Sequence, residues 1–182
     1  MRKECLSIYE KQDLTRYLEQ RTGRFKRVKT GYRDREGRRA KAEYVFLGQE
    51  EVETCRHCGG SLKSKALRIV TQNGQTHIVN GLAKPVENED GEIIIIWVCS
   101  RQCEACKKHQ RVLPACAGRW MRYALTLVAK VLLHLFENDE LTVCGSLKPK
   151  YNRLWDTLPF YGELSTVYRW RQKAKILFTS YC

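Results

Sequence analysis

Two pairs of cysteines are the residues of this chain whose types and spacing could do chemistry, Cys55-Arg-His-Cys58 and Cys103-Glu-Ala-Cys106. A Cys-x-x-Cys turn holds both sulfurs on one side of a tight knuckle, and the two glycines that follow Cys58 let backbone amides face the thiolates. Two knuckles supply four thiolates, which is the tetrahedral set that zinc prefers in structural sites. We therefore expect these four cysteines to bind one structural Zn2+ per chain.

The other cysteines bear on the choice of ligands and on the compartment. Cys99 lies four residues before Cys103 and could replace one ligand or pack at a strand end; we favour Cys103 and Cys106 because they repeat the knuckle spacing. The chain has nine cysteines, an odd number, and its first residues do not have the pattern of a secretory signal, so we expect a reducing cytoplasm rather than disulfides. The cysteines expected to be ordinary buried or terminal thiols are Cys5, Cys116, Cys144 and Cys182.

The segment between the two pairs has the pattern of a small β-sheet. Residues 66–71 and 75–79 are rich in β-branched side chains and flank Asn73-Gly74, a dipeptide that suits a two-residue hairpin turn. The unbroken apolar run 93–98 predicts a third strand that is buried on both faces. Residues 87–91 are predicted as an acidic, solvated loop. We therefore expect a β-ribbon whose ends the metal clamps together.

The charge of the chain is unevenly distributed. The net charge is +13, with 14 basic and 8 acidic residues in 1–50, 5 and 6 in 51–99, and 14 and 6 in 100–182. The ribbon is thus near neutral and its flanks are basic, which favours a nucleic-acid partner, duplex DNA above all, over a merely solvated surface. The N-terminal residues expected to contact nucleic acid are Arg24, Lys26, Arg27, Lys29, Arg38 and Arg39.

The first 50 residues are predicted to hold a helix and a possible hairpin. Ser7 has capping-box spacing, and an apolar side made by Ile8, Leu14, Tyr17 and Leu18 predicts a helix that ends near Gly23. Residues 25–30 and 40–47 are predicted to pair as a basic hairpin.

The last third of the chain has helical periodicity. Apolar residues from Trp120 to Leu135 recur at helical spacing, over a run too short for a membrane span, and predict a core helix. Residues 151–158 repeat the pattern until Pro159 ends it, and a short turn leads to a helix over 163–173. Three helices with a short turn before the last are typical of a helix-turn-helix unit.

The last of these helices is predicted to read DNA. Its apolar side is formed by Val167, Trp170, Ala174 and Leu177. Its polar side carries groups that can contact bases and phosphates, with Ser165 as the expected N-cap. The residues expected to contact nucleic acid are Ser165, Thr166, Arg169, Gln172 and Lys173.

These patterns together predict an α+β protein. We expect a basic N-terminal α/β segment over 1–50, a small zinc-ribbon β-sheet module over 51–114, and a three-helix, helix-turn-helix-like module over 115–182.

The cysteine motifs and the last helix also carry a family resemblance. Over roughly residues 52–175 the chain resembles an uncharacterised bacterial family. The resemblance rests on the first cysteine pair with Gly59 and on the second pair followed by His109, Leu113 and Pro114. It continues through a long helix to the 164–170 segment. Members of this family look like zinc-ribbon and helix-turn-helix proteins associated with transposases and mobile elements. The resemblance implies a DNA-binding accessory or regulatory component of a mobile element, with a recombinase or other protein as a possible partner.

Catalysis is not expected. The acidic residues gather in loop-like segments, 87–92 and 137–140, and the chain has no Gly-rich phosphate loop, His-Glu-x-x-His motif or nucleophile elbow. We expect no catalytic residues and no membrane association. The alternative to a DNA-binding protein is an RNA-binding or protein-docking zinc-ribbon adaptor in a larger nucleoprotein complex.

Overall fold

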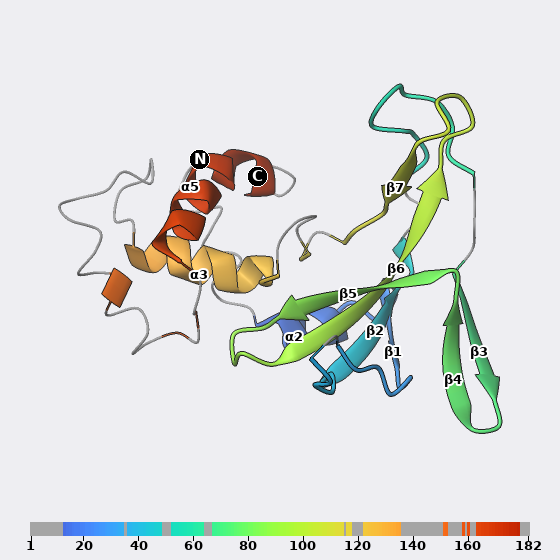
Figure 1. Cartoon of the computed structure of the whole chain (residues 1–182), viewed down its shortest axis with the longest axis horizontal. Coiled ribbons are helices and arrows are strands. Elements are labelled where there is room, and N and C mark those ends of the chain that lie inside the picture. The colour runs from blue at the N-terminus through green and yellow to red at the C-terminus, as the bar shows by residue number, and fades with distance from the viewer. Residues whose placement is uncertain are drawn as a thin grey trace. The chain divides into compact units, whose positions relative to one another are not determined.

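The computed structural model shows an α+β protein with a mixed β-sheet and a few helices (Figure 1). Contacts divide the chain into two compact units, which we call the sheet unit (18–86 and 93–114) and the helical unit (1–17, 87–92 and 115–182). Whether the segments 1–50, 51–114 and 115–182 fold independently stays a prediction. The structure describes residues 13–34, 36–48, 52–63, 67–114, 116–117, 122–135, 151–152, 158, 160 and 163–178, with side chains described as far as residue 173.

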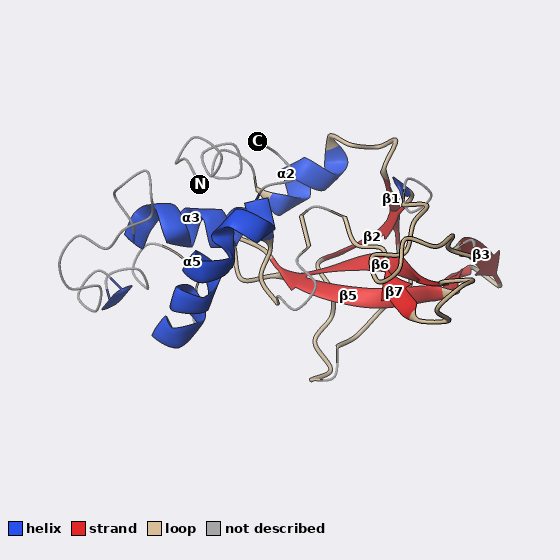
Figure 2. Cartoon of the chain, turned by 90° about the horizontal axis from the view of Figure 1, so that it is seen from above, coloured by secondary structure: helices blue, strands red, loops and turns tan. Residues whose placement is uncertain are grey.

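The main sheet has five strands in the order β1-β2-β6-β5, with β7 also paired to β6 (Figure 2). β1 runs antiparallel to β2, β2 runs parallel to β6, and β6 runs antiparallel to β7. The strands are β1 (Phe25–Val28), β2 (Ala42–Phe46), β5 (Gly81–Glu87), β6 (Ile93–Gln102) and β7 (His109–Arg111). The predicted basic hairpin of residues 25–30 and 40–47 is confirmed by the β1–β2 pairing.

The centre of this sheet is buried on both faces. Every residue of β2 is buried, and Ile94, Ile95 and Ile96 of β6 are fully buried beside it. This confirms the prediction that the apolar run 93–98 is a strand covered on both sides, because a strand with one wet face would alternate.

The predicted hairpin between the cysteine pairs is also confirmed, but it is not part of the main sheet. β3 (Arg68–Gln72) and β4 (Gln75–Val79) form a separate two-stranded sheet. Asn73 and Gly74 connect them with φ of 50° and 74°, as a type I′ turn requires. The residue pattern predicted β3, β4 and β6, but it did not predict that β6 pairs with β2, β5 and β7 rather than with the hairpin.

The prediction for residues 87–91 was wrong. Glu87 is the last residue of β5, a strand that the sequence pattern missed because Pro85 interrupts it; Pro is tolerated on such an outer strand. Glu87, Asn88 and Glu89 are buried, and only Asp90 and Gly91 are exposed. The segment is polar but largely buried, and most of its buried polar groups find partners inside the protein.

Those partners belong to the helical unit. The Nε of Arg122 lies 2.8 Å from Glu87 Oε2, and the amide of Leu14 donates to Glu89 Oε2 at 2.9 Å. The Asn88 side chain accepts from two amides of its own turn, at 2.8 and 3.0 Å. These bonds satisfy most of the buried polar groups of the segment, whereas Glu89 Oε1 is buried without a hydrogen-bond partner among the described residues.

The N-terminal helix is shorter than predicted within the described residues. α2 (Leu14–Glu19) begins after Asp13, whose carboxylate accepts from the Arg16 amide at 2.7 Å and so caps the helix. The predicted apolar side is confirmed for Leu14, Tyr17 and Leu18, which are buried. Ser7 and Ile8 lie outside the described residues.

Two helices pack together in the helical unit. α3 (Leu125–Leu135) is almost entirely buried, and α5 (Leu164–Phe178) packs against it through Val167 and Trp170. The rings of Tyr123, Phe160 and Trp170 lie within 5.0–5.5 Å of one another, which fixes the rotation of α5.

The helix-turn-helix expectation is met only in part. α3 begins at Leu125 rather than near Trp120, which lies outside the described residues. Of the helix predicted over 151–158, the structure describes 151–152 and 158. In the described part of the chain the helices are α2, α3 and α5, and a clear three-helix unit is not evident there.

Candidate metal centre and basic surfaces

The two cysteine pairs form a pair of knuckles with matching backbone geometry. In each knuckle the residue after the second cysteine donates its amide to the carbonyl of the first, Gly59 to Cys55 at 2.7 Å and Lys107 to Cys103 at 3.1 Å. Each of these residues has a positive φ, 74° for Gly59 and 59° for Lys107. The left-handed residue closes the turn so that the two sulfurs of a knuckle emerge on the same side.

The knuckles are also flanked in the same way. Thr54 pairs with Ser61 across the first, as Gln102 of β6 pairs with His109 of β7 across the second. The chain thus uses one short hairpin design twice. The sequence showed the two spacings, and the structure shows that the backbone around them repeats as well.

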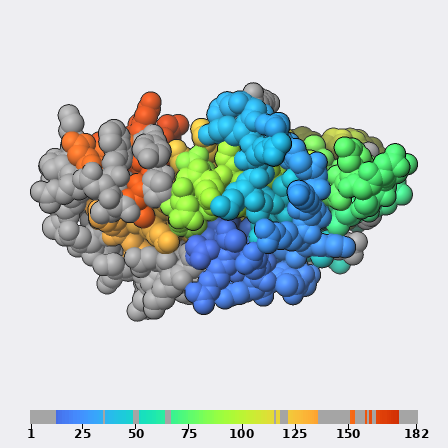
Figure 3. Space-filling view, turned by 90° about the horizontal axis from the view of Figure 1, so that it is seen from below, coloured from blue at the N-terminus to red at the C-terminus, as the bar shows by residue number. Residues whose placement is uncertain are grey.

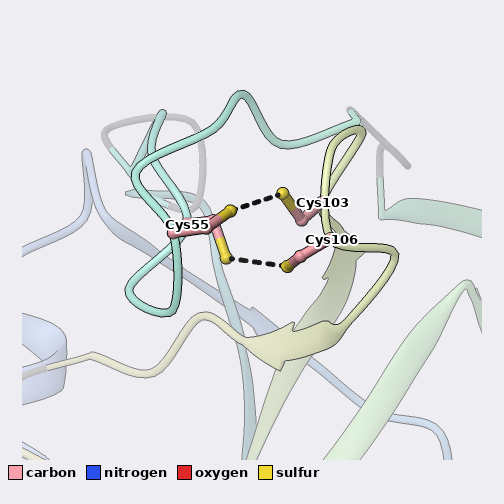
Figure 4. Close-up of side chains that lie close together, drawn as sticks. Cys55, Cys103 and Cys106 are labelled. Carbon is pink, nitrogen blue, oxygen red and sulfur yellow. Dashed lines mark hydrogen bonds between the residues drawn. The ribbon is translucent and has the colours of Figure 1, made fainter.

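The four sulfurs face one another across the gap between the knuckles (Figure 4). The Sγ atoms of Cys55 and Cys106 lie 3.7 Å apart, those of Cys58 and Cys103 lie 3.5 Å apart, and all four lie within 4.8 Å of one another. Tetrahedral coordination with metal–sulfur bonds of about 2.3 Å would separate the sulfurs by about 3.8 Å. The arrangement can therefore hold one metal ion.

Close packing at Gly60 lets the knuckles approach. A Cβ at this position would lie 3.0 Å from the Cβ of Ala105, 3.3 Å from Cys103 Sγ and 3.4 Å from Cys58 Sγ. Any side chain there would push against the opposite knuckle. The second glycine after the first pair is therefore needed for space, whereas Gly59 is needed for its backbone conformation.

Two buried polar side chains hold the knuckles in register. Gln110 of β7 accepts from the Arg56 amide at 3.1 Å and donates to the Thr54 carbonyl at 3.4 Å, so it joins β7 to the first knuckle. Arg101 of β6 donates to the carbonyl oxygens of Val52, Leu62 and Lys63. Sequence reasoning missed both residues, because an arginine or glutamine in a polar stretch gives no signal of burial.

Two thiol groups of the cluster, those of Cys103 and Cys106, have different pKa values. The Cys106 amide donates to Cys103 Sγ and lowers the pKa of Cys103 to about 7, against a smaller opposing effect of burial. The Lys108 amide lowers the pKa of Cys106, but burial and the neighbouring thiols outweigh it and raise that pKa to about 11. A cation among the sulfurs would relieve this competition, because each thiolate would face the metal rather than another thiolate.

Cys99 lies apart from the four. It is buried in β6, and burial is the main cause that raises the pKa of its thiol. The preference for Cys103 and Cys106 over Cys99 therefore matches the geometry. Cys116 is also buried, as expected, while Cys5, Cys144 and Cys182 lie outside the described residues. The side chains of His57, His77 and His109 are exposed and not among the clustered ligands.

The N-terminal cations expected to contact nucleic acid are all exposed. They lie on β1 and on the turn and loop beside it, in the part of the sheet unit drawn in blue in Figure 3. Some are partly compensated: Arg27 lies 3.6 Å from Glu19, and Arg38 lies 2.8 Å from Asp34 and 2.7 Å from Glu36.

The acidic residue of β2, next to this basic surface, is buried. Glu43 is buried and accepts five hydrogen bonds, one from the indole of Trp97 at 3.2 Å and one from the hydroxyl of Thr30. The other three come from the consecutive amides of Thr30, Gly31 and Tyr32, at 3.0–3.2 Å. This cradle of amides fixes the start of the loop that carries Arg38 and Arg39. Sequence reasoning did not identify Glu43.

The residues expected on the polar side of α5 lie on that side. Ser165, Arg169, Gln172 and Lys173 are exposed and Thr166 is half-exposed, opposite the buried Val167 and Trp170. The side chains of Ala174 and Leu177 lie outside the description.

Ser165 is not the N-cap that was predicted. The helix begins at Leu164, and the carbonyl of Glu163 accepts from the amides of Thr166 and Val167. The Ser165 hydroxyl instead donates to the Glu163 carboxylate at 3.0 Å. Arg169 lies back along the first turn, with Nε 3.4 Å from the Ser165 carbonyl oxygen.

The acidic segments weighed for catalysis show no grouping of carboxylates around a metal in the described part of the chain. Residues 137–140 lie outside that part, and the absence of catalysis stays a prediction. Among the described helices, none is long and apolar enough to cross a membrane. Comparison of the chain with protein-family models, with curated proteins and with solved structures found no match, so the resemblance to a mobile-element family stays an expectation.

Proposed function

We propose that this chain is a zinc-stabilised nucleic-acid-binding protein that favours duplex DNA. The observation that carries the proposal is the distribution of charge on the sheet unit. The Glu43 carboxylate is buried and accepts five hydrogen bonds, whereas the cations expected to contact nucleic acid are exposed, namely Arg24, Lys26, Arg27, Lys29, Arg38 and Arg39. Exposed cations on one strand and its adjoining loop are the arrangement that a phosphate backbone attracts.

Zinc is proposed as the occupant of the four-cysteine site because of the donor set. Four thiolates at tetrahedral separations are the ligands of structural zinc sites, and no open position remains for a reacting molecule. The ion would join residues 52–63 to the end of β6. Its part in this proposal is to hold the fold rather than to act on a substrate.

The polar side of α5 is proposed as a second contact with DNA. The aromatic contacts of Trp170 fix the helix against α3, which leaves Arg169, Gln172 and Lys173 exposed together. Arginine and glutamine can pair with guanine and adenine in the major groove, and lysine can pair with phosphate. We include in the proposal that α5 acts as the recognition helix of a helix-turn-helix-like unit. Its exposed polar side chains, and the helical spacing of its apolar residues in the sequence, support this role.

The test measures binding to duplex DNA, single-stranded DNA and RNA across a salt series. Two double variants, Lys26→Gln/Lys29→Gln and Arg169→Gln/Lys173→Gln, are each expected to lower the salt slope of duplex binding by about 2, since each phosphate contact contributes about 0.9. The matched control Arg16→Gln/Lys130→Gln removes the same charge from positions outside the proposed surfaces and should leave the slope unchanged.

Three outcomes decide between the proposal and its rivals. Wild-type protein that binds none of the three nucleic acids contradicts the proposal. Equal affinity for all three, without sequence preference, removes the DNA-reading role of α5 and leaves electrostatic binding. Preference for RNA favours the RNA-binding adaptor instead.

The biological role that we propose is an accessory or regulatory one in a mobile genetic element. The cysteine motifs and the 164–170 segment support it through their resemblance to proteins of that kind. A recombinase gene beside the gene for this chain, and co-purification of the two proteins, would be the expected observations; a neighbourhood without any recombinase would count against this role.

A further inference from the structure

The β3–β4 hairpin has an unusual exposure for a sheet element. It forms its own two-stranded sheet, and neither strand has a buried residue. In Figure 1 it projects from the strands of the sheet unit. A lone two-stranded hairpin is marginally stable in water, so an exposed hairpin of this kind suggests that a binding partner covers it.

The two faces of the hairpin differ in chemistry. Side chains alternate along a strand, so the pairs Ile69–Ile78 and Thr71–Thr76 share one face, which we call the inner face. Ile78 on this face lies against Gly81, where an added Cβ would come within 2.3 Å of Ile78 Cγ2. The inner face therefore begins to pack at the base of the hairpin.

The opposite face, which we call the outer face, is exposed and polar. Its six residues are the pairs Arg68–Val79, Val70–His77 and Gln72–Gln75. All except the half-buried Val79 are exposed, and in the described part of the chain none of its polar side chains makes a hydrogen bond or ion pair with the protein. Arginine, glutamine and histidine are the polar side chains that this face offers, beside two valines.

The surrounding sequence lacks negative charge. Residues 54–86 contain five basic residues and no Asp or Glu, so the near neutrality of 51–99 comes from acids at its two ends. Three of those acids stand at or beside the buried segment 87–89. The hairpin thus presents uncharged and positive groups to any partner that approaches it.

We propose, on the basis of the nucleic-acid-binding function proposed above, that the outer face of the β3–β4 hairpin reads base edges in the major groove of duplex DNA. The major groove admits a two-stranded β-ribbon, and its base edges accept paired hydrogen bonds from Gln and Arg side chains. Gln72 and Gln75 face each other across the rung next to the turn, where a ribbon reaches deepest. The narrow major groove of RNA would exclude the hairpin.

The experiment uses the full, zinc-loaded chain and a duplex selected from a randomised library by the wild-type protein. Gln72→Ala/Gln75→Ala should weaken binding to the selected duplex by about 5- to 150-fold for each lost paired contact. Binding to a scrambled duplex, and the salt slope, should not change because no charge is removed. The matched control is Thr71→Ala/Thr76→Ala, which alters the inner face and should keep the sequence preference.

A change in the DNA provides a second test that uses the wild-type protein and therefore does not depend on whether a variant folds. Replacing adenine by 7-deazaadenine in the selected duplex removes the N7 acceptor, and should weaken binding of the wild-type protein. The same replacement should have no further effect on Gln72→Ala/Gln75→Ala, because the contact is already lost.

The failures can be told apart. If the wild-type protein binds no nucleic acid, the proposed function has failed. If it binds duplex DNA but selects no sequence, or if the glutamine variant and the deaza duplex behave like the originals, base reading by the hairpin is overturned while the proposed function stands.

Discussion

Gly59 and Lys107 occupy the same position in the two cysteine knuckles. Each follows the second cysteine of its pair, donates its amide to the carbonyl of the first, and has a positive φ. Glycine adopts this conformation readily, whereas a lysine in it is strained by contact between its Cβ and the backbone. The second knuckle therefore keeps a strained residue where the first has the residue best suited to the turn.

Lys107→Gly is expected to stabilise the protein by up to about 1.6 kcal/mol. Relief of the left-handed conformation contributes roughly 1–2 kcal/mol, and the added freedom of glycine in the unfolded chain offsets roughly 0.4–1 kcal/mol. Denaturant unfolding at a fixed free zinc concentration measures the change. Lys108→Gly, at a position without positive φ, should destabilise instead; equal effects of the two substitutions would contradict the assignment of strain to Lys107.

Loss of one clustered cysteine should abolish the metal site. Cys106→Ser is expected to reduce bound zinc well below one ion per chain and to unfold residues 52–63 and 98–112, because binding energy is folding energy in such sites. Elemental analysis and hydrogen exchange provide the measurements. Cys99→Ser is the control, since Cys99 lies outside the cluster, and should keep one zinc per chain while lowering stability by about 1–3 kcal/mol for the buried hydroxyl. A metal-free wild-type protein with an intact sheet would contradict the site.

Gly81→Ala should displace the base of the β3–β4 hairpin. The new Cβ would lie 2.3 Å from Ile78 Cγ2 and 3.3 Å from Trp97 Cε3, so a side chain or the backbone must shift. We expect a loss of about 1–3 kcal/mol, as for overpacked sites, with a change in Trp97 fluorescence. Gly23→Ala is the control, because a Cβ there meets nothing within 4 Å. Equal stabilities of the two variants would rule out the close contact.

Glu43→Gln should loosen the loop after β1. An amide in place of the carboxylate would turn donor hydrogens toward the Thr30 hydroxyl or the Trp97 indole, which are themselves donors to Glu43. A loss of about 1.5–3 kcal/mol is expected, in the range for hydrogen bonds to charged groups. Equilibrium unfolding measures it. Glu36→Gln, on an exposed carboxylate, should change stability by less than about 0.5 kcal/mol. If both substitutions prove equally mild, the amide cradle does not hold the loop.

Local patterns in the sequence predicted the local structure well. Asn73-Gly74 specified the turn of the β3–β4 hairpin, the isoleucine run specified β6, and Val167 and Trp170 specified the buried side of α5. Each of these features depends on neighbours within a few residues, or on a side chain's preference for burial. Such preferences can be read without knowing the fold.

The partners of these elements could not be predicted in the same way. The parallel pairing of β2 with β6 joins residues about 50 apart, and no local signal marks it. The burial of Glu87 and Glu89 depends on Arg122 and Leu14, which are far away in sequence. A carboxylate in a polar stretch therefore suggested solvent, although its distant partners place it inside.

The sequence by itself determined which cysteines can act together, because a Cys-x-x-Cys spacing dictates the geometry of a single knuckle. Only the tertiary structure decided that the two knuckles face each other with all four sulfurs within 4.8 Å. That approach depends on contacts between segments some 40–50 residues apart. The contacts are the close packing that the missing side chain of Gly60 allows and the hydrogen bonds of the Arg101 and Gln110 side chains. Covalent spacing fixes short-range geometry, whereas the meeting of distant segments depends on packing and hydrogen bonds that form only when the whole unit folds.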